Sequence, residues 1–196
     1  MTTTTSARPR PTLLVHALVP VPHRGLRTLV QLVLGVGFLA LLAQVRIEIG
    51  PVPVTGQTLG VLLLAAAGGL RLGFATVAAY LAVGLAGLPV FSGGGGGLAT
   101  LSGVTAGYLV GFLVAAAVVG AWTERIGTRD ASSVAAVMLT GTVVIYAFGV
   151  TWLARFAPDL ATAFAWGVWP FVLGDLVKVG VAMTLLPLAA RWAGPR

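Results

Sequence analysis

The segment GVWPFVLGDLVKVGVAMTLLPLAA, residues 167–190, decides the class of this protein. It is long and apolar enough to cross a bilayer as one helix, since about 20 apolar residues span a hydrocarbon core of roughly 30 Å. Yet Asp175 and Lys178 place two charges among its Val, Leu and Phe side chains. Each mid-helix charge costs about 2.5 to 3.5 kcal/mol on insertion, so the pair costs about 5 to 7 kcal/mol, against about 3 to 7 kcal/mol gained from the apolar side chains. We therefore expect this helix to be marginal alone and its two charges to have a role.

The remainder of the chain has the same apolar character. Its 196 residues are 58% hydrophobic and 9% charged, a composition typical of membrane proteins. Apolar runs predict six transmembrane helices, at 26–45, 52–70, 72–90, 102–122, 132–153 and 166–192. We expect an all-α integral membrane protein with a single membrane domain over 25–196, preceded by a disordered or juxtamembrane tail over 1–24.

The basic residues predict the orientation of these helices. Nine of the twelve Lys and Arg fall on one side of the predicted bundle, two fall on the other, and Lys178 lies within it. By the positive-inside rule, both termini are then cytoplasmic and the loops 46–58, 87–103 and 155–167 face outward. The net charge of +7 is explained by this topology, so we expect no nucleic-acid partner.

Asp175 and Lys178 are three residues apart, so on a helix they share a face and can pair. Two interpretations stay open. The pair locks the last helix to its neighbours, or it lines a substrate or ion path, which is the more common role of charges inside a membrane.

Two outer segments contain further candidates for a binding site. The run GGGGG, 93–97, lacks the following Lys of a phosphate-binding loop, so it is either a flexible linker or backbone that closely approaches a bound molecule. The segment GPVPVTGQT, 50–58, either caps a helix or presents Thr55, Gln57 and Thr58 to an outer vestibule.

The residue inventory argues against an enzyme. The chain has no Cys, no His in any predicted span, and one carboxylate within the predicted membrane region. An intramembrane hydrolase needs a nucleophile with a base, and a metal-dependent transferase needs clustered carboxylates. We therefore expect no catalytic residue, no metal site, no nucleotide-binding motif and no cofactor in this chain.

Three segments, 50–73, 80–112 and GDLVK at 174–178, occur in an order and spacing that resemble the BioY family. These are the biotin-binding S components of energy-coupling-factor (ECF) transporters, and the resemblance runs from about residue 27 to 190. It implies six helices, an outward pocket for biotin and a place in a prokaryotic cell membrane. It also implies an ECF module of two ATPases and a transmembrane coupling protein, which hydrolyses ATP and docks on the first helix.

The resemblance places Asp175 and Lys178 at the substrate. The two ureido N–H groups of biotin suit a carboxylate, whereas its ureido oxygen and its carboxylate both suit an ammonium group, so the end that meets Lys178 stays open. The other candidate substrate-binding residues are Thr55, Gln57, Phe91, Gly95, Gly97, Thr105, Tyr108 and Trp169.

Two features depart from the family pattern. The segment GVTAGY, 103–108, replaces Gly-Pro-Thr-Gly-Gly-Tyr, which affects the start of the fourth helix. The first helix lacks an alanine pair four residues apart, so Gly35 and Ala43 are the expected docking face.

The function expected from these residues is biotin uptake by a high-affinity S component of an ATP-driven ECF transporter. One alternative is a self-sufficient biotin facilitator. Another is a structural membrane subunit in which the ion pair only locks helices together.

Overall fold

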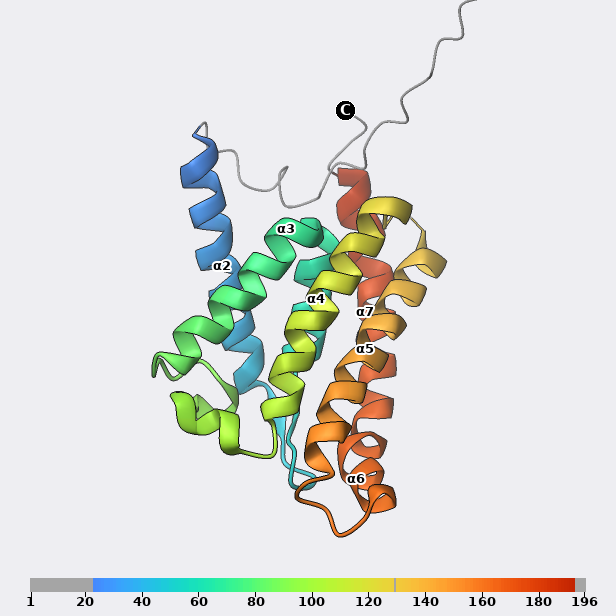
Figure 1. Cartoon of the computed structure of the whole chain (residues 1–196). Helices are drawn as coiled ribbons and strands as arrows, with labels where there is room; N and C mark the ends of the chain where they lie inside the picture. The colour runs from blue at the N-terminus through green and yellow to red at the C-terminus, as the bar shows by residue number, and fades with distance from the viewer. Residues whose placement is uncertain (1–22, 129, 193–196) are drawn as a thin grey trace, which may run out of the picture.

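The computed structural model describes residues 23–128 and 130–192 (Figure 1). The expected N-terminal tail, 1–24, therefore lies almost wholly outside the described residues. In chain order the elements are α2 (Arg24–Gln44), β1 (Arg46–Ile47), β2 (Val54–Thr55), α3 (Gln57–Leu85), the 3-10 helices η1 (Ser92–Gly94) and η2 (Leu98–Ser102), α4 (Ala106–Ile126), α5 (Ala131–Leu153), α6 (Leu160–Gly167) and α7 (Trp169–Trp192). The described chain is thus helical apart from one short hairpin and its loops.

The described residues contain five helical stretches that are long and apolar enough to cross a membrane, namely Arg24–Gln44, Gln57–Leu85, Ala106–Ile126, Ala131–Leu153 and Leu160–Arg191. The second and third predicted spans both fall largely within α3, which is interrupted at Gly69 with φ 70° and ψ −172°. This backbone conformation is open to glycine and strained for other residues. Figure 1 shows α3 rising to one end of the bundle and turning there to run back, so it forms two arms, 57–68 and 70–85.

Glycines allow the helices at the centre of the bundle to approach closely. A Cβ on Gly73 would overlap the backbone of Ala65 in the opposite arm of α3, and one on Gly120 of α4 would overlap the α3 turn at Gly69. A Cβ on Gly107 would overlap α5 in the same way. As a result α4 lies between α3 and α5, and α7 packs against both α5 and α3.

Helix α2 packs on the bundle through one narrow face. Its buried residues are Gln31, Gly35, Leu39 and Ala43. Gly35 lies directly against Thr76 of α3, and Ala43 is fully buried. The expectation that Gly35 and Ala43 form an outward docking face is therefore wrong: both residues point into the bundle.

Two local elements were not expected from the sequence. Strands β1 and β2 pair antiparallel with Arg46 opposite Thr55, so the segment 46–58, expected as an outward-facing loop, contains a short hairpin. The segment 155–167, expected as another outward-facing loop, contains α6, because the Asp159 side chain accepts a hydrogen bond from the Thr162 N–H at 2.7 Å and caps the helix.

Candidate functional site

A cavity of about 140 Å³ lies where the hairpin, the glycine-rich loop and the first turns of α3 and α4 meet. In Figure 1 this is the lower end of the bundle. Helices α5 and α7 complete the wall through Tyr146 and Phe171. Segments that are far apart in sequence, 46–58, 91–112 and 146–171, thus contribute to one site.

Aromatic rings form much of the cavity wall. Tyr108 and Phe171 stack with centroids 6.0 Å apart and an interplanar angle of 27°, and Tyr146 lies 6.2 Å from the same Phe171 ring. The Tyr108 hydroxyl donates to the Gly167 carbonyl at 2.8 Å, which fixes the ring. Phe91 and Phe112 also line the cavity. Such walls suit a flat, largely apolar ligand with a few polar groups.

Asp175 and Lys178 form an ion pair, with Lys178 Nζ 2.6 Å from Asp175 Oδ1, as their spacing predicts. Lys178 Nζ also donates to the Thr55 carbonyl at 2.8 Å and to Thr58 Oγ1 at 2.6 Å, so it has three hydrogen-bond acceptors. Asp175 accepts from Thr58 Oγ1 at 3.1 Å and, through Oδ2, from the Tyr146 hydroxyl at 2.6 Å. The pair thus joins α7 to α3 and α5.

This ion pair lies one layer behind the cavity surface. Thr55, Thr58 and Tyr146 line the cavity, and each contacts Asp175 or Lys178 from the other side. The carboxylate therefore orients two hydroxyl groups at the wall, which are able to reorient toward a ligand.

A second chain of hydrogen bonds ties the start of α3 to the loop that follows its C-terminal end. The Gln57 side chain donates from Nε2 to the Tyr80 hydroxyl at 2.8 Å, and that hydroxyl donates to the Val90 carbonyl at 3.0 Å. Thr55 Oγ1 donates to Gln57 Oε1 at 3.0 Å. Because Gln57 is buried, these bonds satisfy its polar atoms and fix the position of the cavity rim.

Arg46 contributes a cationic group to the cavity rim. Its side chain is 39% exposed, and its Nη2 lies 2.6 Å from Glu48 Oε1. The guanidinium packs against Gly93, which has φ 70° and no Cβ to obstruct it. The backbone conformation at position 93 therefore favours glycine, and a Cβ there would displace the Arg46 guanidinium.

The glycine-rich loop is held by the end of α2. Gln44 Nε2 donates to the Phe91 carbonyl at 3.1 Å, and its Oε1 accepts from the Gly94 N–H at 3.1 Å. Ser92 Oγ, also in the cavity wall, is buried and has no hydrogen-bond partner within the described part of the chain. A buried hydroxyl without a partner is costly, so Ser92 is a candidate for a ligand contact.

Most of the candidates chosen from the sequence come together here. Six of them line the cavity: Thr55, Gln57, Phe91, Gly95, Thr105 and Tyr108. Asp175 and Lys178 lie immediately behind it. Gly97 is not among the lining residues, and its N–H donates to the Gly84 carbonyl at 2.7 Å. Trp169 is 73% exposed at the start of α7 and lies outside the cavity wall.

Several wall residues were not predicted from the sequence, chiefly Arg46, Ser92, Tyr146 and Phe171. Arg46 had a detectable signal, as one of two basic residues on the predicted outer side. Tyr146 and Phe171 had none, because a single aromatic residue in an apolar helix is usually part of the core.

Comparison with known proteins gives consistent results. The profile of the BioY family matches residues 10–194. A probable biotin transporter BioY of Pyrococcus horikoshii is 38% identical over 143 residues, which cover 73% of this chain and 83% of that protein. The biotin transporter BioY of Rhizobium etli is 40% identical over 154 residues, which cover 75% of this chain and 82% of that protein.

A solved structure has the same fold. It is a crystal structure of the S-component for biotin from an ECF-type ABC transporter. The TM-score is 0.78 at 26% sequence identity, and the match covers 90% of this chain and 95% of the other.

Proposed function

The chain belongs to the BioY family, and from that membership we propose that it takes up biotin as the high-affinity S component of an ECF transporter. As a member of a family of membrane transporters, it is a transport protein rather than an enzyme. The observation that carries the proposal for biotin is the cavity itself, which combines aromatic walls, a guanidinium at the rim and a hydrogen-bonded ion pair behind its inner wall.

The polar groups of the cavity suggest how biotin binds. Arg46 at the rim suits the valerate carboxylate, because a guanidinium donates two parallel hydrogen bonds to that group. Ser92 Oγ adds a neighbouring hydroxyl from the same rim. The ureido ring then contacts Thr58 and Tyr146, whose hydroxyl groups are oriented by their hydrogen bonds to Asp175.

We propose that the ureido end of biotin is the end that lies nearer to Lys178. With the carboxylate at Arg46, the ureido end faces the wall backed by Lys178, and the bicyclic ring packs against Tyr108 and Phe171. Thr55, Gln57, Phe91, Gly95 and Thr105 complete the proposed site. We leave out Trp169 and Gly97, which do not line the cavity.

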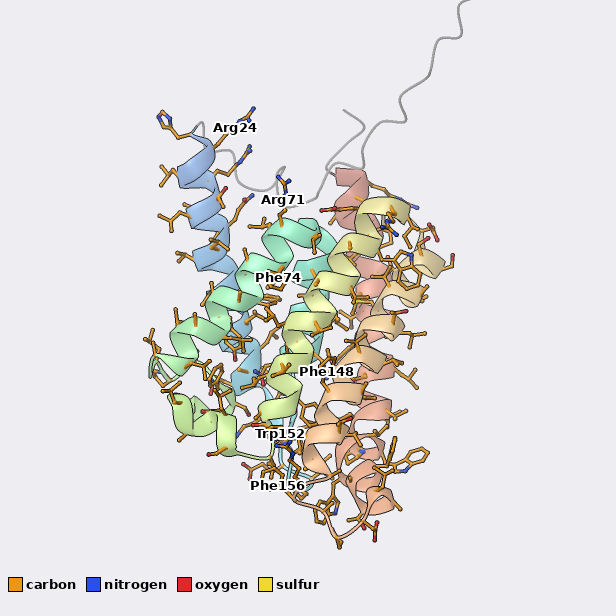
Figure 2. The ribbon with its side chains drawn as sticks, in the orientation of Figure 1. Arg24, Arg71, Phe74, Phe148, Trp152 and Phe156 are labelled. Atoms are coloured by element: carbon orange, nitrogen blue, oxygen red, sulfur yellow. The ribbon has the colours of Figure 1, made fainter. Side chains whose placement is uncertain are left out.

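We propose six membrane crossings, with both arms of α3 counted, cytoplasmic termini and a cavity open to the outside of a prokaryotic cell. The distribution of charge supports this orientation. Figure 2 shows Arg24 and Arg71 at the end of the bundle opposite the cavity, where the positive-inside rule expects the cytoplasm.

The proposed energy source is an ECF module of two ATPases and a transmembrane coupling protein, so that ATP is used by the partners and this chain carries no cofactor. Docking on α2 remains the proposal, but through its outward face. Val33, Gly37 and Leu41 are exposed at four-residue spacing, and nothing lies within 4 Å of a Cβ built on Gly37. A small residue on an exposed face lets a partner helix approach closely.

The test is equilibrium binding of labelled biotin to the purified chain in detergent. Tight binding that excess unlabelled biotin displaces supports the proposal, and a folded chain that does not bind refutes it. Reconstitution in liposomes separates the S component from the self-sufficient facilitator: the facilitator would equilibrate biotin across the membrane without partners, whereas the S component would bind it and transport it only with the module.

A further inference from the structure

A second concave surface lies on the side of the bundle, at the seam between α4 and α5. This groove of about 380 Å³ is lined by Gly107 and Val110 of α4, by Ala147, Phe148, Thr151 and Trp152 of α5, and by Arg155. Figure 2 shows Phe148 and Trp152 along this seam, in the half of the molecule that contains the cavity. Apart from the buried Gly107 and the half-buried Trp152, the lining residues are exposed, so the groove is open to whatever surrounds the bundle.

Arg155 places a positive charge at the end of this apolar groove. Its guanidinium carbon lies 4.5 Å from the centroid of the Trp152 ring, a cation–π contact. Trp152 Nε1 donates to the Gly103 carbonyl at 3.0 Å, which fixes the ring that supports the arginine. Within the described residues Arg155 forms no ion pair. The acidic residue nearest in sequence, Asp159, caps α6 instead.

The position along the bundle is that of a membrane interface. Helix α5 ends at Leu153, two residues before Arg155, and Trp152 with Arg155 is the pairing of side chains that favours the headgroup region. From there Phe148 and Val110, 40% and 46% exposed, continue toward the middle of the apolar span. Arg155 thus places a positive charge suited to a lipid headgroup next to an apolar groove that can hold an acyl chain.

From this geometry we infer that the groove between α4 and α5 binds one anionic phospholipid of the leaflet on the cavity side. The phosphate accepts hydrogen bonds from the Arg155 guanidinium, and one acyl chain lies in the groove against Phe148 and Val110. Charge complementarity selects this occupant over a neutral lipid, because the arginine has no carboxylate partner in the described chain. The inference does not depend on biotin.

Native mass spectrometry of the purified full-length chain tests it. Phosphatidylglycerol and phosphatidylcholine with identical acyl chains are added at equal concentration, and the retained lipid is counted. We expect wild type to retain one phosphatidylglycerol about fivefold in preference, as expected for one basic side chain at an anionic lipid surface. Arg155→Gln should remove the preference, and Ala147→Phe, which fills the groove, should reduce retention of both lipids.

Arg71→Gln is the matched control, since it removes the same charge at the opposite end of the bundle and should keep the preference (Figure 2). Thermal unfolding verifies that each variant is folded. If Ala147→Phe does not fold, Thr151→Phe is used to fill the groove instead. Three results would overturn the inference: no preference in wild type, an equal loss in Arg71→Gln, or normal retention when the groove is filled.

Discussion

Replacing Asp175 by Asn separates the two roles that its ion pair can have. The substitution keeps the shape of the side chain but removes the charge, and it leaves one oxygen for three donors: Lys178 Nζ, Thr58 Oγ1 and the Tyr146 hydroxyl. If the amide oxygen takes the Oδ1 position, the Tyr146 hydroxyl loses its acceptor. Lys178, whose side chain is only 15% exposed, loses its counter-charge.

The magnitude follows from these losses. Removing one partner of a buried ion pair costs about 3–5 kcal/mol, most of it from the uncompensated charge that remains. The lost hydrogen bond to Tyr146 belongs to the charged class, worth about 1.5–3 kcal/mol, and overlaps with that figure rather than adding to it. We expect Asp175→Asn to lower the free energy of unfolding by about 3–5 kcal/mol and to weaken biotin binding as well.

The double variant Asp175→Asn with Lys178→Met distinguishes the causes. Removing the stranded charge should restore much of the stability, because well-packed neutral groups can replace a buried pair at little cost. Binding should not recover, because Thr58 and Tyr146 still lack the carboxylate that orients them at the cavity wall.

The free energy of unfolding and the affinity for biotin are measured on the same preparations, the first by unfolding in detergent and the second by equilibrium binding of labelled biotin. Asp159→Asn serves as the matched control, since it makes the same change at the cap of α6 and should leave affinity unchanged. If binding recovers together with stability in the double variant, the pair is only a structural clasp. Our placement of the ureido ring would then be wrong.

Three further predictions concern the rim and the far end of the bundle. Arg46→Gln should weaken biotin binding about 10- to 100-fold, as for a lost charge-assisted hydrogen bond, and should barely change binding of the uncharged biotin methyl ester; equal losses for both ligands would contradict the assigned carboxylate partner. Gly93→Ala should weaken biotin binding more than Gly94→Ala. Both positions have positive φ, so the backbone strain is similar, but only at Gly93 would a Cβ meet the Arg46 guanidinium. Equal affinities of the two variants would refute this reasoning. Hydrogen bonds, chiefly the one from the Ser132 hydroxyl, lower the pKa of Asp130 to about 2. The stabilisation that the carboxylate gives is therefore complete above its unfolded pKa near 4 and is lost as the pH falls toward 2. The difference in melting temperature between wild type and Asp130→Ala should shrink over that pH range, and a constant difference would exclude the carboxylate as its source.

Local features of this molecule were predictable from the sequence because they depend on spacing along one helix. The pairing of Asp175 with Lys178 follows from a separation of three residues, and the helical class follows from long apolar runs. The turn within α3 was also indicated, since the predicted spans 52–70 and 72–90 meet close to Gly69, where the backbone has positive φ.

The cavity could be predicted only in part. Thr55, Gln57 and Phe91 lie in segments that were predicted to face outward and whose composition already indicated a site, and they do line the cavity. Tyr146 and Phe171 come from apolar stretches with no comparable signal, and they reach the cavity only because α5 and α7 pack beside α3.

The sequence by itself therefore determined that the chain belongs in a membrane, that it is built of long helices and that Asp175 pairs with Lys178. Only the tertiary structure decided which side of each helix faces the bundle. The physical reason is that lipid tails are as apolar as a protein core, so hydrophobicity does not distinguish the two sides of a membrane helix. That is why Gly35 and Ala43, expected on the outer surface of α2, are buried, while the exposed Val33 and Leu41 are no less apolar than the buried Leu39.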